Sequence, residues 1–284
     1  LIALGLAPIV VMLAIAVRRR HSVSLGISLA ALLVALACVF IARSVAPRDV
    51  TELFHVDTFG LFYVAFAVAI AFAVLAVGYP YLAHRESHPE EYYILVLIAT
   101  AGSCVMSLST HFVSFYLGLE ILSVAQYGLV AYIRRDHRGT EAGLKYLVLA
   151  AASAAFLLFG MALVYAELGT MDFAALANAS AEQLDNHVVL LGVAMMFASI
   201  GFKLSLVPFH YWTPDVYEGA TGSVAGFAAT AGKLGILVIL LRYFVRESAP
   251  VTEALSLFIA IAAAASLILG NLLALIQTNI TRLL

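Results

Sequence analysis

Four ionisable side chains lie inside long apolar segments of this sequence, where a charge is costly. They are Glu120, Lys145, Lys203 and Lys233, and the three lysines are all the lysines of the chain. The twelve arginines, by contrast, all fall in polar connections or at the ends of apolar segments. Because arginine stays charged whereas a buried lysine can release its proton, this division favours proton exchange within the hydrophobic part of the molecule.

The cost of these charges indicates where they must face. Each charge at the centre of a bilayer disfavours insertion by about 2.5–3.5 kcal/mol, so four would cost on the order of 10 kcal/mol unless paired or hydrated. Such residues normally face the interior of a helix bundle and mark an ion or proton pathway.

Glu120 lies near the middle of the apolar segment 111–133. Tyr116, Glu120, Ser123 and Tyr127 follow one another at steps of four, three and four residues, which places these polar groups on one face of a helix. The alternative is a neutral glutamic acid that is hydrogen-bonded to a neighbouring backbone.

The lysines differ in depth. Lys203 has Ser199 one turn before it on the same face, and Lys233 follows Thr230 near the middle of the segment 224–245. The alternative for both is a side chain that stretches to the membrane surface, but it would have to cross several more apolar residues. Lys145 begins its segment, so reaching the surface is as good an interpretation as a role inside.

A proline-rich stretch follows Lys203. Residues 208–214 hold Pro208 and Pro214, the single tryptophan, and His210. Proline removes a backbone donor, and broken helices of transporters line water-filled cavities, so this stretch predicts a discontinuous helix. A plain interfacial loop with aromatic residues is the alternative. His210 can exchange protons near neutral pH, although a hydrogen-bonded structural histidine is an equally simple interpretation.

Composition requires that these residues sit in membrane helices. The chain has 284 residues, of which 64% are hydrophobic and 11% are charged, with a mean hydropathy of +1.04. A soluble domain has about 45–50% apolar and 25% charged residues. Runs this long and continuously apolar predict membrane-spanning helices rather than the short alternating strands of a barrel. We expect them near residues 1–17, 23–42, 59–82, 92–109, 111–133, 144–168, 188–209, 224–245 and 254–275.

The arginines indicate an orientation. When the connections are numbered alternately, eight arginines fall on one side and four on the other, which favours the first side as cytoplasmic and places the N-terminus outside. The first side has Arg18, Arg19, Arg20, Arg85, Arg134, Arg135, Arg138 and Arg282; the second has Arg43, Arg48, Arg242 and Arg246.

Other chemistry is not indicated. Cys38 and Cys104 lie in apolar runs, and the sequence has no metal-ligand spacing, glycine-rich phosphate loop or nucleophile elbow. Any redox centre is therefore expected on another chain. Because the sequence starts at Leu1 and stops within 281–284, we interpret it as part of a longer protein.

Two stretches carry a family resemblance. The first comprises residues 115–123 (FYLGLEILS), 143–147 (GLKYL) and 156–165 (FLLFGMALVY); the second comprises 202–204 (FKL) and 208–220 (PFHYWTPDVYEGA), with Lys233 downstream. From about Phe59 to the last residue, the chain resembles the antiporter-like membrane subunits of proton-pumping NADH:quinone oxidoreductase, respiratory complex I. The run 212–220 is most similar to subunit N.

The resemblance implies an all-α polytopic membrane protein, an antiporter-like bundle of inverted repeats with a discontinuous helix. It implies N-terminal transmembrane helices over 1–91, a first repeat over 92–245 broken near 188–223, and the start of a second, largely missing repeat over 246–284. It also implies that Glu120, Lys203 and Lys233 take part in proton translocation, with Glu120 paired to Lys203, Lys233 receiving the proton next, and Lys145 and His210 as possible relays on the same polar axis.

By the same resemblance, the chain would be a subunit of a proton-translocating enzyme in the bacterial inner membrane. It would have no cofactor of its own, since quinone, flavin and iron–sulfur centres belong to partner subunits, and its partners would be other membrane subunits and the lipid bilayer, with no nucleic acid. One departure is that Thr221-Gly222-Ser223 replaces the family's usual Pro-Thr-Pro, which leaves the subfamily open. A subunit of a sodium/proton antiporter or membrane-bound hydrogenase, or a scaffold that transports nothing, are the alternatives.

Overall fold

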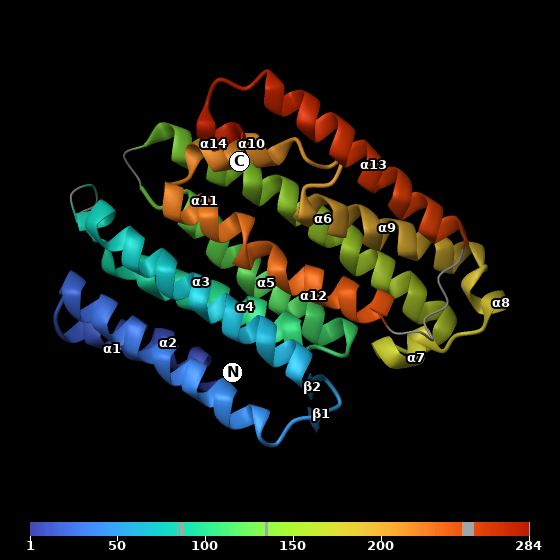
Figure 1. The fold of residues 1–284 in the computed structure, drawn as a ribbon, viewed down its shortest axis with the longest axis horizontal. Helices are drawn as coiled ribbons and strands as arrows, with labels where there is room; N and C mark the ends of the chain where they lie inside the picture. Colours follow the sequence, from blue (N-terminus) through green and yellow to red (C-terminus); the bar gives the residue numbers. More distant parts are fainter. Residues whose placement is uncertain (84, 86–87, 134–135, 246–252, 284) are drawn as a thin grey trace.

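The computed structural model describes residues 1–83, 85, 88–133, 136–245 and 253–283. Its long helices lie side by side as an elongated bundle, with α1 and α2 at one edge and α13 at the opposite edge (Figure 1). In chain order the elements are α1 (Ile2–Val17), α2 (His21–Arg43), β1 (Arg48–Thr51), β2 (Phe54–Val56), α3 (Thr58–Ala83), α4 (Glu90–Leu108), α5 (Phe112–Val130), α6 (His137–Leu168), α7 (Phe173–Ala177), α8 (Ala181–Leu184), α9 (His187–Leu204), α10 (Trp212–Gly219), α11 (Gly222–Ala229), α12 (Ala231–Val245), α13 (Glu253–Leu275) and α14 (Ile280–Leu283).

The protein is a multi-pass membrane protein. Within the described residues, eight helical stretches are long and apolar enough to cross a bilayer, and α1 is a shorter apolar helix. They coincide with the nine expected segments, since α11 and α12 together form one span over Gly222–Arg242. Large apolar side chains of α1, α6 and α13 are exposed, as is expected where lipid or a partner surrounds the helices.

Two helix ends, and the middle of one expected segment, differ from the predicted boundaries. Helix α6 starts at His137, earlier than 144, because the Asp136 carboxylate accepts a hydrogen bond from the Arg138 amide at 3.0 Å. Helix α9 ends at Leu204, earlier than 209, where Ser205 adopts the left-handed conformation with φ 61°. The expected segment 224–245 is interrupted at Thr230, whose hydroxyl donates to the Gly226 carbonyl at 2.6 Å.

A small β-hairpin lies in the connection between α2 and α3, which the all-α prediction did not include. Strands β1 and β2 are antiparallel, with Arg48 opposite Val56. The Leu53 carbonyl at the turn accepts hydrogen bonds from the Thr110 amide and the Ser114 hydroxyl, so the hairpin is fastened to the start of α5. Strands of four and three residues are too short to give a pattern that stands out beside the long apolar helices.

Ion pairs agree with the alternate numbering of the connections. Arg19 is 2.8 Å from Glu91, which joins the α1–α2 and α3–α4 connections, and Arg242 is 2.9 Å from Asp57 at the other end of the bundle. Arg134, Arg135 and Arg246, which entered the arginine count, lie outside the described residues. The direction in which the bundle crosses the membrane stays a prediction.

The core is centred on α4, which packs against α1, α2, α3, α5 and α12. Its closest approach is to α5, where a Cβ atom added at Gly102 would lie 2.6 Å from the Leu122 amide nitrogen and 2.7 Å from the Gly118 carbonyl oxygen. Glycine is therefore required there by contact between two backbones, and this approach sets the position of the helix that carries Glu120.

We expect Gly102→Ala to separate α4 from α5 and to destabilise the protein by about 1–3 kcal/mol, the usual cost of overpacking. Thermal unfolding of the purified protein in detergent would measure this as a lower midpoint. Gly26→Ala is the matched control, because nothing lies within 4 Å of a Cβ atom added there. Equal midpoints for the two variants would contradict the role given to Gly102.

Candidate functional site

Lys203 occupies the last turn of α9 and is 5% exposed. Its ammonium donates to the Ser123 hydroxyl on α5 at 2.5 Å and lies 5.5 Å from the centre of the Tyr146 ring on α6. Ser123 in turn donates to the Leu119 carbonyl at 2.6 Å. The side chain thus stays among three helices rather than stretching to the surface.

Glu120 lies one turn before Ser123 on α5 and is half-buried. Its Oε1 atom is fully buried without a hydrogen-bond partner in the described protein, so the hydrogen bond to a neighbouring backbone that was the alternative is not formed by this atom. Glu120 and Lys203 interact electrostatically. Among the described residues no direct ion pair joins them, because the ammonium is held by Ser123.

The expected discontinuous helix is present between α9 and α10. The Trp212 indole donates to the Phe202 carbonyl at 2.8 Å, and the Thr213 hydroxyl donates to the Ser205 hydroxyl at 2.6 Å, so the two halves are tied together across residues 206–211. The left-handed Ser205 turns the chain away immediately after Lys203. The break therefore brings backbone carbonyls and hydroxyls into the apolar interior.

Lys233 adjoins the same break from another helix. It lies in the first turn of α12, and its ammonium donates to the Ser205 hydroxyl at 3.0 Å and to the Leu204 carbonyl at 3.4 Å. It lies 5.9 Å from the centre of the Tyr217 ring. Lys233 thus contacts the end of α9 at the two residues that directly follow Lys203.

His210 lies in the connection between α9 and α10. Its ring stacks on Tyr211 with the centroids 4.5 Å apart, and both ring nitrogens are buried without a hydrogen-bond partner in the described protein. The structure thus places His210 in the break but does not bond it to either lysine.

Lys145 is placed differently from the other lysines. It lies near the start of α6, where its ammonium is 2.9 Å from the Glu141 carboxylate and 3.1 Å from Asp215 on α10, with 47% of its side chain exposed. The structure thus places Lys145 at the end of the bundle and separates it from the Ser123–Lys203 contact.

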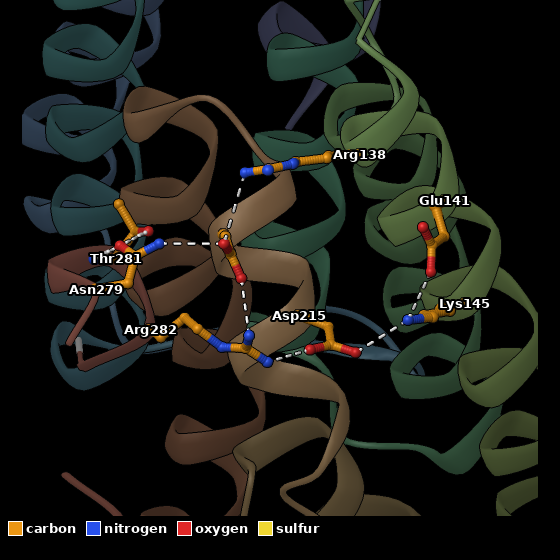
Figure 2. A network of polar contacts seen from close by, with 8 residues as sticks. Arg138, Glu141, Lys145, Asp215, Asn279, Thr281 and Arg282 are labelled. Carbon is orange, nitrogen blue, oxygen red and sulfur yellow. Dashed lines mark hydrogen bonds and ion pairs between the residues drawn. The ribbon is translucent and has the colours of Figure 1, made fainter. Parts of the chain in front are cut away.

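Lys145 belongs to a network of ion pairs that joins α6, α10 and α14 (Figure 2). Arg282 contacts both Asp215 and Glu218, and Glu218 also accepts a hydrogen bond from Asn279 at 3.2 Å. The spacing of Asp215 and Glu218 along the chain gives no indication of a partner at residue 282. Only the three-dimensional packing of α14 on α10 reveals that they are paired.

The sequence analysis did not predict a group of packed aromatic rings next to the lysines. This aromatic wall consists of Tyr146, Trp212 and Tyr217. The Tyr146 hydroxyl donates to Gln126 Oε1 at 2.8 Å, and the Tyr146 ring stacks on Trp212 with the centroids 4.7 Å apart. The one available signal was Gln126, an amide within an apolar segment. No cluster of three or more His, Cys, Asp or Glu residues in the described parts of the chain could hold a metal ion.

The bundle and its buried lysines define an antiporter-like membrane protein. A family model described as NADH:quinone oxidoreductase/Mrp antiporter, TM, matches residues 109–284, which is more than half of the chain. The chain therefore belongs to the NADH:quinone oxidoreductase/Mrp antiporter transmembrane family.

Solved structures agree with this assignment. The chain is similar to one in respiratory complex I from Thermus thermophilus with bound aureothin, with 30% identity and a TM-score of 0.83 over 99% of this chain and 59% of that one. Two further structures at 20% identity share the fold. They are the membrane-bound sulfane sulfur reductase, an archaeal respiratory membrane complex (TM-score 0.82, 99% and 59% covered), and the Mrp complex from Dietzia sp. DQ12-45-1b (0.77, 97% and 53%). The chain thus spans less than two thirds of the length of these relatives.

We expect Asp215→Asn to loosen α10 from α6 and α14, because it removes the carboxylate shared by Lys145 and Arg282. Since these side chains are partly exposed, the loss should be about 1 kcal/mol at low salt and smaller at high salt. Thermal unfolding at two salt concentrations measures it, with Asp185→Asn, an exposed carboxylate that forms no ion pair among the described residues, as the control. A loss that does not change with salt would contradict an electrostatic role for Asp215.

Proposed function

We propose that this chain is a proton-translocating membrane subunit of an NADH:quinone oxidoreductase of the complex I type, of the subunit N kind, in a bacterial inner membrane. Quinone reduction would take place on partner subunits, and this chain would contribute no redox centre. The family membership and the 30% identity with a complex I chain support this assignment. The run 212–220 favours subunit N over the related subunits.

The observation that carries the proposal is that one buried lysine and one half-buried lysine lie at the same helix break. Lys203 lies in the last turn of α9, two residues before Ser205, and Lys233 in the first turn of α12 donates to the Ser205 hydroxyl. A lysine in an apolar interior can take up and release a proton, which a buried arginine does not do. Hydroxyl and carbonyl groups at the break supply the polar surroundings that such exchange needs.

Glu120 would control the first step. While its carboxylate is charged and near Lys203, it favours the protonated ammonium. A rearrangement that draws the two apart would release the proton toward Lys233, as a shift between two pre-existing states. Ser123 would keep Lys203 directed toward α5 in the resting state.

Lys145 and His210 would act as relays at the two margins of this path. His210 lies in the break with both ring nitrogens available for hydrogen bonds, and Lys145 lies at the end of the bundle beside Asp215. We further propose that the end carrying Lys145 faces the cytoplasm, as the excess of arginines favours, and that residues 1–91, 92–245 and 246–284 form the N-terminal helices, the first repeat and the start of the second.

We expect Lys203→Met and Lys233→Met, each in the assembled enzyme in proteoliposomes, to lower the number of protons translocated per NADH oxidised, because each removes a proton-binding site. Proton uptake and quinone reduction would be measured together. Arg48→Met on β1, which also removes one positive charge, is the matched control and should pump normally. Unchanged pumping in both lysine variants, with normal assembly, would instead favour a scaffold.

Sodium transport is a second candidate, since the Mrp complex shares the fold. Sodium binding needs several converging oxygen ligands, and Glu120 is the only carboxylate that the sequence places deep in a membrane segment. Pumping that requires sodium, and that persists in Lys203→Met, would favour this candidate.

We expect Ser123→Ala to slow proton pumping about tenfold, since a hydrogen bond to a charged group is worth about 1.5–3 kcal/mol. Ser28→Ala is a closely matched control, because the Ser28 hydroxyl also donates to the carbonyl four residues before it and is buried, but in α2. The initial rate of proton uptake is the measurement. Equal rates in both variants would contradict the role of Ser123 in holding Lys203.

A further inference from the structure

Two polar atoms beside the lysines are buried without a hydrogen-bond partner in the described protein. They are Gln126 Nε2 and the Tyr217 hydroxyl, on side chains that are 2% and 3% exposed. Most buried polar groups in proteins are hydrogen-bonded, because an unpaired one loses its contact with water and gains nothing in return. Two such groups in one region therefore need an explanation.

Gln126 lies between the two lysine sites. It follows Ser123, the partner of Lys203, by one turn of α5, and its Oε1 atom accepts the hydrogen bond from Tyr146. Its other end lies against α12, since a Cβ atom added at Gly232 would be 2.2 Å from Gln126 Nε2. Gly232 immediately precedes Lys233, so one amide reaches from the surroundings of Lys203 to the helix of Lys233.

The free polar atom does not depend on how the amide is turned. In the opposite orientation the amide nitrogen would donate to the Tyr146 hydroxyl, and the oxygen would face Gly232 unpaired. Either way, one end of Gln126 satisfies Tyr146 and the other end is available to a further group.

Two tyrosine rings line the same region. Lys203 lies over Tyr146 and Lys233 lies over Tyr217, and Trp212 contacts both rings, stacked on the first and edge-on to the second with centroids 6.4 Å apart. The two unpaired polar atoms thus belong to side chains that adjoin the same group of rings, since Gln126 bonds Tyr146 and Tyr217 packs on Trp212.

We propose that Gln126, together with the hydroxyls of Tyr146 and Tyr217, holds water in a relay that joins the Lys203 site to the Lys233 site. This inference rests on the proposed function and adds to it the residues that conduct between the two lysines. A buried water needs two to four polar partners, which the unpaired atoms and the ammonium groups supply.

The relay conserves the proton. The Lys203 ammonium gives one proton to the adjoining water, and water at the other end gives one proton to the neutral amine of Lys233. Gln126 and the tyrosines neither gain nor lose a proton overall, so no additional charge is buried. They are positioning residues, because they act through the water and the lysines.

The test uses the assembled enzyme in proteoliposomes with the variants Gln126→Leu, Gln126→Glu and Tyr217→Phe. Leucine keeps much of the volume but no polar atom, whereas a glutamic acid of the same length can still bond to Tyr146 and to water. Tyr217→Phe removes one oxygen only, and so keeps the test decisive where Gln126→Leu fails to assemble. Tyr165→Phe, an exposed tyrosine of α6, is the matched control.

We expect Gln126→Leu and Tyr217→Phe to pump at least about tenfold more slowly, in line with the loss of a hydrogen-bonded link worth 1.5 kcal/mol or more, with pumping recovered in Gln126→Glu and normal in Tyr165→Phe. Normal pumping in Gln126→Leu or in Tyr217→Phe would overturn the relay, as would equal losses in Gln126→Leu and Gln126→Glu. If these variants pump normally while Lys203→Met and Lys233→Met do not, the relay fails and the proposed function stands.

Discussion

The burial of the Lys203 ammonium between α5, α6 and α9 is the constraint on which the rest of the site depends. An ammonium taken out of water needs hydrogen-bond acceptors, and the desolvation cost is several kcal/mol if they are missing. The protein supplies one acceptor directly, the Ser123 hydroxyl, and an aromatic face, that of Tyr146. Ser123 on α5 and Tyr146 on α6 must therefore both lie next to the ammonium, which requires α5, α6 and α9 to pack closely.

The packing meets this requirement at points where side chains are small. Helices α4 and α5 touch at Gly102 and Gly118, and α6 and α9 touch at Gly160 and Gly192, where a Cβ atom at Gly160 would be 2.5 Å from the Gly192 carbonyl oxygen. In a bilayer there is little hydrophobic gain from bringing apolar helices together, so close contact of this kind provides much of the attraction. The glycines thus fix the distance between α4 and α5 and the distance between α6 and α9.

Much of the fold could be predicted from the sequence because long apolar runs have few options in a bilayer. The nine segments, the helix break after Lys203 and the deep placement of Lys203 followed from composition, proline and charge. The β-hairpin did not, because its strands are too short to show a pattern. The kink at Thr230 did not either, since Thr230 looks like any other polar residue in a helix.

The contacts within the site could be predicted only in part from the sequence. The sequence identifies which charged residues are buried, because a charge within a long apolar segment is recognisable from the residues around it. The partners of these residues lie on helices that are distant in the chain, so the sequence does not identify them. The contacts of Lys233 with Leu204 and Ser205 join residues 29 and 28 positions apart, and Lys203 and Ser123 are 80 positions apart. The ion pairs of Asp215 depend in the same way on α14, whose approach to α10 has no signal in the sequence.

The hydrogen bond from the Trp212 indole to the Phe202 carbonyl has a mechanical consequence. It ties the first residue of α10 to the residue before Lys203, while Asp215 and Glu218 tie the far part of α10 to Arg282. Helix α10 therefore connects the ion pairs of Asp215 and Glu218 to the backbone next to Lys203. A displacement of these ion pairs by a neighbouring protein would therefore reach α9 at Phe202, directly before Lys203.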